Sequence, residues 1–431
     1  MEAQHIVVVG GGAGGLELAT HLGKKYKRNK QVSVTLIDRN LTHVWKPLLH
    51  EVAAGALDAD IDGVDYRVQA AQAGFNFLPG ELCGIDNEQR VIKLAAIKDD
   101  QGQQIVAARE IPFTYLVLAI GSVTNDFGTK GAQDHCFFLD SVKQATRFHH
   151  QLMNTFLSLQ AEKYPRPLKV AIVGGGATGV ELSAELYKSA ELIRAYGFSD
   201  FELSQLQITL VEAGQRILPA LPERIAAAAQ QELMNLGVKV LAQTPVVEVN
   251  EHGLVTQSGE LIEATIKVWA AGVKAPEFLA KLGCFETNRA NQIQVLPTLQ
   301  STTDSHIFVI GDCAAVTQKD GSRVPPRAQA AHQMASCAFV NIKAMLEQQP
   351  LRHFEYRDHG SLVSLSSYSA VGSLMGNLTR GAMMVEGWLA RIMYKSLYRM
   401  HQVAVHGYFK TFLFILVQRL NRRLKPRLKL H

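Results

Sequence analysis

Two glycine-rich loops of the form G-x-G-x-x-G carry the clearest chemical information in this sequence. Their defining glycines are Gly10, Gly12 and Gly15 in the first loop and Gly174, Gly176 and Gly179 in the second. Glycines at this spacing leave backbone N–H groups bare, so a pyrophosphate can approach them and place its charge at the positive end of the following helix. Because the loop occurs twice, the sequence predicts two dinucleotide sites in one chain.

An acidic residue ends the apolar run that follows each loop. Asp38 is expected to accept hydrogen bonds from an adenosine ribose. Glu212 stands at the matching place after the second loop, where a carboxylate binds a free 2′-hydroxyl and repels a 2′-phosphate, so NADH is expected there rather than NADPH. Glu212 lies 33 positions after Gly179 instead of the usual figure of about twenty, and we attribute the excess to a longer helix and loop. The alternative for either acid is a solvated strand end.

Strands are expected to position both loops. A β-branched run precedes each of them, at residues 6–9 and 170–173, and a helix-like stretch follows. Further apolar runs end in small turns at Gly121, Gly272 and Asp312. Ligands collect beyond the carboxyl ends of parallel strands, so we assign Gly121 and Asp312 to a flavin site, with Asp312 holding a ribityl hydroxyl, and Gly272 to the NADH half. The pattern predicts an α/β fold with two doubly wound dinucleotide-binding domains.

Composition sets limits on the reaction. A chain of 431 residues with 47% hydrophobic content is enough for two or three globular domains. The first strand is expected within the first six residues, which leaves no room for a signal peptide and favours a cytoplasmic catalytic part. The five cysteines show neither C-x-x-C nor metal-like spacing, so no metal site and no thiol exchange are expected. Electrons from NADH must therefore leave through another acceptor.

Seven segments together resemble the membrane-associated type II NADH:quinone oxidoreductases, which are non-proton-pumping respiratory NADH dehydrogenases. They are GGGAGG at 10–15, WKPLLHEVA at 45–53, GGGATGVELSAEL at 174–186, LVEAG at 210–214, VWAAGV at 268–273, GDCA at 311–314 and AQAAHQ at 328–333. The resemblance covers essentially the whole chain, and residues 360–381 look like the proteobacterial form. It implies glutathione-reductase-like domains, non-covalent FAD, NADH and a membrane quinone.

The resemblance also implies an order of domains along the chain. The expected parts are a first FAD-binding segment at 1–160, an NADH-binding domain at 161–284, a second FAD-binding segment with a quinone-site helix at 285–345, and a C-terminal membrane-anchoring domain at 346–431.

The glutamines of the AQAAHQ segment are the expected quinone ligands. Gln329 and Gln333 are four residues apart, so on a helix they share one face and can present amides to the carbonyl oxygens of a quinone. His332 is a weaker candidate for a proton donor. Without the resemblance, a packed alanine-rich helix with exposed glutamines would be the preferred interpretation.

Three further residues receive roles from the resemblance. Glu181 directly follows the second loop and is implied to lie near the nicotinamide and flavin rings; the alternative is a first-turn glutamate stabilised by the helix dipole. Pro47 is a candidate for contact with the isoalloxazine ring, with Lys46 beside it. One departure from the family is His359, where many members carry lysine, so a lysine contact to the flavin from there is in doubt.

The C-terminal tail predicts attachment to a membrane surface. Residues 379–431 hold eleven Lys and Arg against one acid, a balance of +10 that leaves −5 for the remainder of the chain. Apolar residues recur at helical spacing between 385 and 400, and a second apolar run at 412–417 precedes six basic residues. A bilayer span needs about 20 predominantly apolar residues, which neither stretch supplies. The tail is therefore expected to lie on the cytoplasmic face of the inner membrane, bound to anionic lipid.

The tail has two other interpretations. A dimer-forming helix is compatible with a membrane role and would make the chain a homodimer. A nucleic-acid-binding tail is disfavoured by the large apolar residues between the basic ones.

These observations predict an FAD-dependent enzyme that oxidises NADH and reduces membrane quinone by two electrons without pumping protons. A soluble NADH oxidase or ferredoxin-reductase-like flavoprotein is one alternative, but it would need neither the basic tail nor the glutamine pair. A non-catalytic NADH-sensing flavoprotein is another, which steady-state turnover with a quinone would exclude. Sulfide:quinone reductases normally use closely placed redox cysteines, which this sequence lacks.

Overall fold

The computed structural model describes residues 3–162, 166–197, 201–365, 369–374, 383–424 and 428–429. The chain forms two compact units, each assembled from three separate stretches of sequence. The first unit contains Met1–Trp45, Gly63–Val123 and Val273–Asp358, and the second contains Lys46–Asp62, Thr124–Gly272 and His359–His431. Each unit is described by itself.

A five-stranded parallel sheet is the centre of the first unit. In spatial order its strands are β22 (Ile307–Val309), β11 (Tyr115–Leu118), β1 (Gln4–Val9), β2 (Val32–Asp38) and β5 (Asn76–Pro79). The strands β1, β11 and β22 are almost fully buried, as expected of apolar runs in a parallel sheet. A smaller antiparallel sheet of β6 (Leu82–Asp86), β7 (Val91–Leu94) and β10 (Arg109–Pro112) completes this part of the unit.

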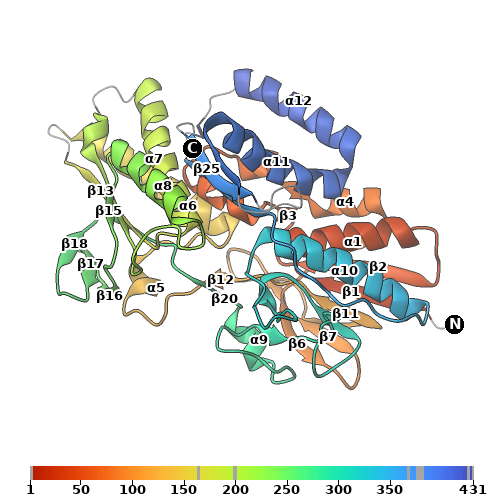
Figure 1. The fold of residues 1–431 in the computed structure, drawn as a ribbon. Helices are drawn as coiled ribbons and strands as arrows, with labels where there is room; N and C mark the ends of the chain where they lie inside the picture. The colour runs from red at the N-terminus through yellow and green to blue at the C-terminus, as the bar shows by residue number, and fades with distance from the viewer. Residues whose placement is uncertain are drawn as a thin grey trace. The chain divides into compact units, whose positions relative to one another are not determined.

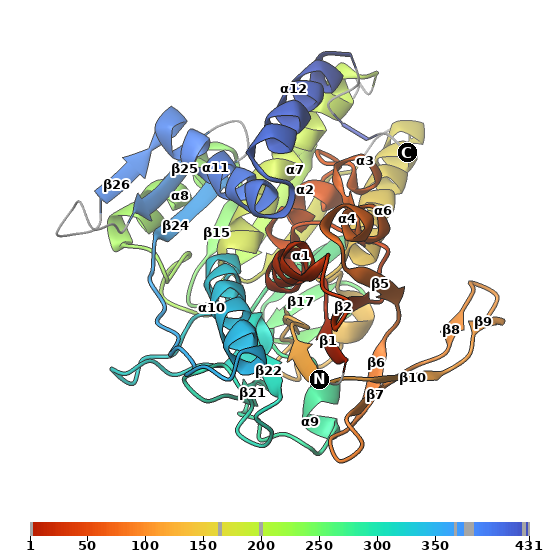
Figure 2. The ribbon, with the colours of Figure 1, turned by 90° about the vertical axis from the view of Figure 1, so that its right-hand side faces the viewer.

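Two long helices of the first unit pack against each other, although they are far apart in the sequence. They are α1 (Ala13–Tyr26) and α10 (Ala328–Leu346), and they lie side by side in both views (Figure 1, Figure 2). Small residues allow the close approach: a Cβ on Gly14 would lie only 3.0 Å from the carbonyl oxygen of Ala331. The helix α4 (Tyr66–Ala73) also contacts α1.

The second unit repeats the parallel arrangement with four strands. In spatial order they are β15 (Lys239–Leu241), β14 (Leu206–Val211), β13 (Leu168–Val173) and β19 (Ile266–Trp269). The helices α6 (Val142–Ala161), α7 (Ala177–Ala195) and α8 (Glu223–Asn235) belong to this unit, as does an antiparallel sheet of β16 (Val246–Val249), β17 (Gly253–Thr256) and β18 (Leu261–Glu263). The expected α/β fold with two parallel nucleotide-binding sheets is thus confirmed.

The C-terminal part of the chain belongs to the second unit. Strands β24 (Gly360–Leu365), β25 (Ser369–Leu374) and β26 (Met383–Glu386) form an antiparallel sheet, and β24 contacts α7. The helix α11 (Gly387–His406) packs on β25, and α12 (Tyr408–Leu424) packs on α11 (Figure 1). Among the described helices, none combines the length and apolar character needed to cross a membrane.

Candidate functional site

The first glycine loop joins β1 to α1, and each glycine has its own steric role. Gly10 has a φ of +102°, and a Cβ there would overlap the carbonyl oxygen of Ala119. A Cβ on Gly15 would overlap the carbonyl oxygen of Gly10, so only glycine lets the helix approach the strand this closely. Gly12 is the N-cap of α1, and no heavy atom of the described protein lies within 4 Å of the position its Cβ would take. The helix N-terminus is therefore open to an anion at Gly12.

The peptide between these glycines is fixed from two sides. The N–H of Gly11 donates to Oδ2 of Asp38 at 2.6 Å, and the hydroxyl of Tyr66 donates to the Gly11 carbonyl at 2.7 Å. Burial raises the pKa of Tyr66 well above its ordinary value, so the phenol stays protonated as a donor. Asp38 thus shapes the loop directly, in addition to the ribose contact expected from its position at the end of β2.

The second loop reproduces this geometry between β13 and α7. Gly174 has a φ of +110°, and a Cβ there would lie 2.7 Å from the backbone of Ala271. A Cβ on Gly179 would overlap the Gly174 carbonyl oxygen. Gly176 caps α7, and the described protein places no heavy atom within 4 Å of its Cβ position. The helix that follows has 19 residues, against 14 in α1, which accounts for part of the long spacing to Glu212.

Glu212 occupies the position that Asp38 has in the first unit. Its Oε2 accepts from the N–H of Gly175 at 2.7 Å, as Asp38 accepts from Gly11 at 2.6 Å. The other oxygen, Oε1, accepts from the N–H of Gly214 at 2.6 Å, so the backbone orients both oxygens of Glu212. A carboxylate held in this way at a strand end is pre-organised to meet a ribose diol.

The expected ribityl-binding acid lies beside the turn that contains Gly121. Ser122 follows β11 and Asp312 follows the adjacent strand β22. Oδ2 of Asp312 accepts from the hydroxyl of Ser122 at 2.7 Å. The backbone carbonyl of Asp312 accepts from Nε2 of Gln292 at 2.9 Å. Gly121 has a φ of +78°, with no heavy atom of the described residues within 4 Å of its Cβ position. The structure therefore brings Gly121 and Asp312 together at one edge of the sheet.

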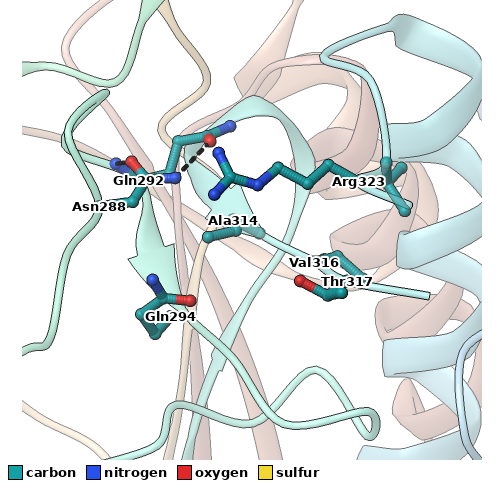
Figure 3. A pocket seen from close by; sticks show the side chains of 9 residues that line it. Asn288, Gln292, Gln294, Ala314, Val316, Thr317 and Arg323 are labelled. Atoms are coloured by element: carbon teal, nitrogen blue, oxygen red, sulfur yellow. Dashed lines mark hydrogen bonds between the residues drawn. The ribbon is translucent and has the colours of Figure 1, made fainter. Parts of the chain in front are cut away.

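Gln292 also lines a polar pocket next to β21 (Ile293–Gln294) and β23 (Ala314–Ala315). Figure 3 shows the carboxamide of Gln292 bonded to Asn288, with Arg323 extending toward them. None of the nine residues that line this pocket is acidic. Gln292 thus links the pocket to the peptide of Asp312.

Glu181 is buried in the second unit next to a histidine. Its Oε2 lies 3.6 Å from Nδ1 of His50, and these side chains are 6% and 3% exposed. Its Oε1 accepts from the N–H of Ser364 in β24 at 3.0 Å. Burial lowers the pKa of His50 to about 4, although a hydrogen bond to the backbone of Pro47 acts in the opposite direction. His50 and Glu181 therefore form a buried pair, and the exposed Pro47 is joined to His50 through its backbone.

Lys46 begins the short helix η1 (Lys46–Leu48) that leads to α2 (Leu49–Ala53). Its Nζ lies 3.5 Å from Oδ1 of Asp140, and the Lys46 side chain is 41% exposed. Asp140 also accepts from the N–H and the hydroxyl of Thr124, each at 2.8 Å. Lys46 is thus held by an acid that is itself fixed, which orients the start of the segment that contains Pro47.

Gly272 ends the turn after β19. It has a φ of +65°, and a Cβ there would overlap the ring of Phe127. Its carbonyl accepts from the N–H of Asn125 at 3.3 Å, and the Asn125 carbonyl accepts from the indole of Trp269 at 2.9 Å. These contacts show why glycine is required in this turn.

Gln329 and Gln333 lie on the first turns of α10, as expected, and both face the segment at Arg357 and Asp358. Nε2 of Gln329 donates to Oδ1 of Asp358 at 3.1 Å. The carboxamide of Gln333 donates to the Arg357 carbonyl at 2.8 Å and accepts from the Arg357 N–H at 2.9 Å. An ion pair of Arg327 with Asp358 at 3.1 Å holds the same segment. One donor and one acceptor function of Gln333 are therefore already used within the protein.

The tail exposes the apolar residues expected on a membrane-facing helix. Several large side chains of α12 are at least 43% exposed, namely Tyr408, Phe409, Phe412, Leu413, Phe414, Leu416, Val417 and Leu420. On α11, Met400 is 64% exposed. The other residues of the apolar face expected there, Val385, Trp388, Leu389, Ile392 and Leu397, lie outside the side chains that the structure describes.

Residues 428 and 429 contact the second unit, to which they belong. Nζ of Lys429 lies 3.2 Å from Asp58, and its N–H donates to the Gly55 carbonyl at 2.9 Å. The Lys429 carbonyl accepts from Nε2 of His149 at 2.9 Å, and the neighbouring Leu428 is 3% exposed. Nε2 of Gln418 in α12 donates a hydrogen bond to Oδ1 of Asp62 at 2.8 Å.

All five cysteines are free thiols. Burial raises the pKa of Cys313, which directly follows Asp312, to about 11, and that of Cys136 to about 12. Thiolates are the reactive form of cysteine, so these two thiols are poorly suited to exchange chemistry.

Sequence reasoning missed several residues that complete these sites. Ser122 could have been found, because it directly follows Gly121 in the same turn. Tyr66, Gln292 and His50 gave no local signal, since each acts on a residue that is distant in the sequence.

Comparisons with known proteins agree with this geometry. Residues 4–335 match the family model of the pyridine nucleotide-disulphide oxidoreductases. The chain is 50% identical to the type II NADH:quinone oxidoreductase of Haemophilus influenzae, over 99% of this chain and 100% of the relative. It is 32% identical to the enzyme of the same name from Staphylococcus saprophyticus, over 88% and 92% of the two chains.

Solved structures show the same fold at low sequence identity. The NDH2 protein of Plasmodium falciparum in complex with NADH is 18% identical and superimposes with a TM-score of 0.82, over 99% of both chains. The sulfide:quinone oxidoreductase of Aquifex aeolicus is 17% identical, with a TM-score of 0.73 over 98% and 96% of the two chains. By its sequence relatives, the chain belongs to the pyridine nucleotide-disulphide oxidoreductases and, within them, to the type II NADH:quinone oxidoreductases.

Proposed function

We propose that this NADH:quinone oxidoreductase works with a non-covalently bound FAD in its first unit and NADH in its second. The observation that carries the proposal is the duplication of one loop geometry. Each unit has an open helix N-terminus, at Gly12 and at Gly176, and a carboxylate that accepts from the loop backbone. NADH accounts for only one of these sites, so the other is free for a second dinucleotide.

The residues of the first unit fit FAD. The N-terminus of α1 at Gly12 is accessible to a pyrophosphate, and Asp38 lies at the strand end where a ribose is bound. Asp312, oriented by Ser122, supports a ribityl hydroxyl. When bound, FAD supplies the chemistry of accepting a hydride and passing its two electrons on to a quinone.

The second unit supplies the NADH site. The N-terminus of α7 at Gly176 takes the pyrophosphate, and Glu212 accepts from the adenosine ribose and rejects a 2′-phosphate. Glu181 places the nicotinamide end, with its carboxylate fixed by the N–H of Ser364 and by the neighbouring imidazole of His50. Gly272 contributes the turn after β19.

We place the quinone headgroup at the first turns of α10. Gln329 and Gln333 bind its carbonyl oxygens through side-chain N–H groups. A carboxamide carries two N–H donors, and the donor bond of Gln333 to the Arg357 carbonyl uses one of them. Pro47 and Lys46 are proposed to lie along the isoalloxazine ring.

We propose that the tail holds the enzyme on the cytoplasmic face of the inner membrane. The exposed apolar side chains of α12, such as Phe409 and Phe412, support this assignment, and so does the basic balance of residues 379–431. The domain bounds proposed from the sequence are 1–160 and 285–345 for FAD, 161–284 for NADH and 346–431 for the membrane. They differ from the two units, because 46–62 and 124–160 belong to the second unit and 273–284 and 346–358 to the first.

The decisive experiment separates the two half-reactions. Wild-type protein loaded with FAD should oxidise NADH with ubiquinone or menaquinone analogues in steady state. Gln329→Leu should lower quinone turnover about two- to tenfold, the scale expected when a neutral hydrogen bond of about 0.5 to 1.5 kcal/mol is lost, while stopped-flow bleaching of the flavin by NADH stays near the wild-type rate. Ser336→Ala, an exposed position on the same helix, is the control. Equal loss of both half-reactions in a folded Gln329→Leu protein would move the quinone site elsewhere.

A further inference from the structure

Each carboxylate oxygen of Asp358 contacts a different residue at the start of α10. Oδ2 accepts from Nη1 of Arg327, the N-cap of the helix, at 3.1 Å, and Oδ1 accepts from Nε2 of Gln329, also at 3.1 Å. The Arg327 and Asp358 side chains are 27% and 33% exposed, so the ion pair is partly shielded from water. All three residues belong to the first unit. Asp358 therefore joins a cation to one of the two glutamines at which we place the quinone.

The contact with Asp358 fixes the orientation of the Gln329 amide. A carboxylate has only hydrogen-bond acceptors, so the amide nitrogen, and not the amide oxygen, must face it. The amide group is planar, and once one of its N–H groups is bonded, the direction of the second N–H is set as well. Asp358 thus determines in which direction Gln329 donates and in which direction it accepts.

The Gln333 amide is oriented by the neighbouring peptide. The Arg357 N–H donates to Oε1 of Gln333 at 2.9 Å, and Nε2 of Gln333 donates to the Arg357 carbonyl at 2.8 Å. Within the described part of the chain, the second N–H of Gln333 has no hydrogen-bond partner, whereas its oxygen has one. The consecutive residues Arg357 and Asp358 therefore orient both amides of this helix turn.

We propose that Asp358 is a positioning residue that makes the site a hydrogen-bond donor and so favours binding of quinone over quinol. The inference rests on the quinone site proposed at Gln329 and Gln333. A quinone oxygen is a carbonyl and only accepts hydrogen bonds, so it pairs with N–H groups. A quinol oxygen carries a proton that needs an acceptor, and a second donor leaves this proton without one. The oriented amides thus hold the substrate more tightly than the product, which favours product release.

Asparagine in place of Asp358 should reverse the Gln329 amide. Asparagine has a single side-chain oxygen, and the charged guanidinium of Arg327 is the stronger partner for it. The NH2 group of the asparagine then faces Gln329, which must turn its own oxygen toward that group. In the direction in which the wild type offers an N–H, the Asp358→Asn protein offers an oxygen lone pair.

The test measures equilibrium binding of both ligands to the full FAD-loaded chain without NADH and without oxygen. The ligands are a soluble short-chain ubiquinone analogue and its quinol, and calorimetry gives a Kd for each while the flavin spectrum shows that the flavin stays oxidised. The wild type should bind the quinone about two- to tenfold more tightly than the quinol, the scale of one neutral hydrogen bond. Asp358→Asn should remove or invert this preference. Asp100→Asn, at an exposed position of the same unit, is the matched control and should keep the wild-type ratio of the two Kd values.

Arg327→Gln distinguishes orientation of the amide from a merely structural role of the ion pair. It removes the cation but leaves the carboxylate as an acceptor, so Gln329 keeps its orientation and the ratio of the two Kd values should stay as in the wild type. A structural role predicts the same change in Arg327→Gln and in Asp358→Asn.

The outcomes separate this inference from the proposed function. Absence of quinone turnover and of quinone binding in the wild type would refute the proposed function itself. Equal affinity of the wild type for quinone and quinol would overturn the role of Asp358 and leave the proposed function intact, and this measurement does not depend on the folding of any variant. An unchanged ratio in folded Asp358→Asn protein, or the same change in both variants, would also overturn it.

Discussion

Nδ1 of His50 lies 3.6 Å from Oε2 of Glu181, and both side chains are almost completely buried. Burial lowers the pKa of His50 to about 4, so near neutral pH the imidazole carries no charge and Glu181 faces a neutral ring rather than a counter-ion. The N–H of Ser364 supplies the hydrogen bond that holds the carboxylate. His50 and Glu181 therefore pack together without a permanent salt bridge between them.

His50 should make the protein less stable in acid. Its folded pKa is below the unfolded value of 6.5, so the unfolded chain binds more protons between these values, and stability falls as the pH drops from about 6.5 to about 4. The shift corresponds to about 3 kcal/mol at most. Urea unfolding of FAD-loaded protein at pH 7 and pH 5 measures the loss. His50→Gln should reduce this difference and exposed His150→Gln should not; the same pH dependence in all three proteins would contradict the prediction.

Glu212 should decide between NADH and NADPH. Glu212→Gln replaces an anionic acceptor with a neutral one, which costs on the order of 1.5 to 3 kcal/mol for a hydrogen bond to a charged group. We expect NADH affinity to fall at least tenfold and the rejection of NADPH to weaken, because a 2′-phosphate no longer meets a negative charge. Comparison of kcat/KM for the two nucleotides measures both effects, with exposed Glu260→Gln as the control. Similar kcat/KM values of the wild type for NADH and NADPH would show that Glu212 does not face the 2′-position of the adenosine ribose.

Two glycines of the first loop should fail in different ways when replaced by alanine. At Gly12 a methyl group meets no described protein atom within 4 Å, so Gly12→Ala should fold with a normal Tm but bind FAD more weakly, because the methyl group enters the space of the pyrophosphate. At Gly15 it overlaps the Gly10 carbonyl oxygen, so Gly15→Ala should lower the Tm as well. Flavin content and thermal unfolding distinguish the two. Normal FAD binding by a folded Gly12→Ala protein would argue against a phosphate at this helix end.

Membrane attachment should depend on the exposed face of α12. Phe409 and Phe412 are 75% and 63% exposed, and their insertion into lipid is worth about 3 kcal/mol together, or roughly a hundredfold in affinity. The double variant Phe409→Ser with Phe412→Ser should lose sedimentation with anionic liposomes but keep NADH-driven ferricyanide reduction. Leu157→Ser, another exposed apolar position, is the control. High salt should release the wild type only partly, since screening leaves the apolar contribution in place.

The double variant tests membrane attachment more specifically than removal of the tail does. Ending the chain after Gly381 should also abolish liposome binding and activity with long-chain quinone. It would, however, remove Lys429, whose side chain pairs with Asp58 and whose carbonyl accepts from His149. Unchanged liposome binding by both the truncated protein and the double variant would place the anchor outside the tail.

The sequence alone determined the parts of the protein that depend on local spacing. A G-x-G-x-x-G loop is recognisable because its glycines meet steric demands within one strand-turn-helix unit, and Gly10, Gly15, Gly174 and Gly179 meet them in the structure. The acids Asp38 and Glu212 were predictable for the same reason, since each ends the strand that follows its loop. The seven motifs that resemble the type II NADH:quinone oxidoreductases, taken in their order along the chain, were enough to predict the fold and the family.

Only the tertiary structure decided which side chains meet across long distances in the chain. Ser122 and Asp312 are 190 residues apart, and Glu17 and His332 are 315 apart. Their contacts arise because β11 pairs with β22 and α1 packs on α10, and no local pattern encodes these pairings. The charge state of a group such as His50 is likewise set by burial, which belongs to the packed unit and not to the residue type.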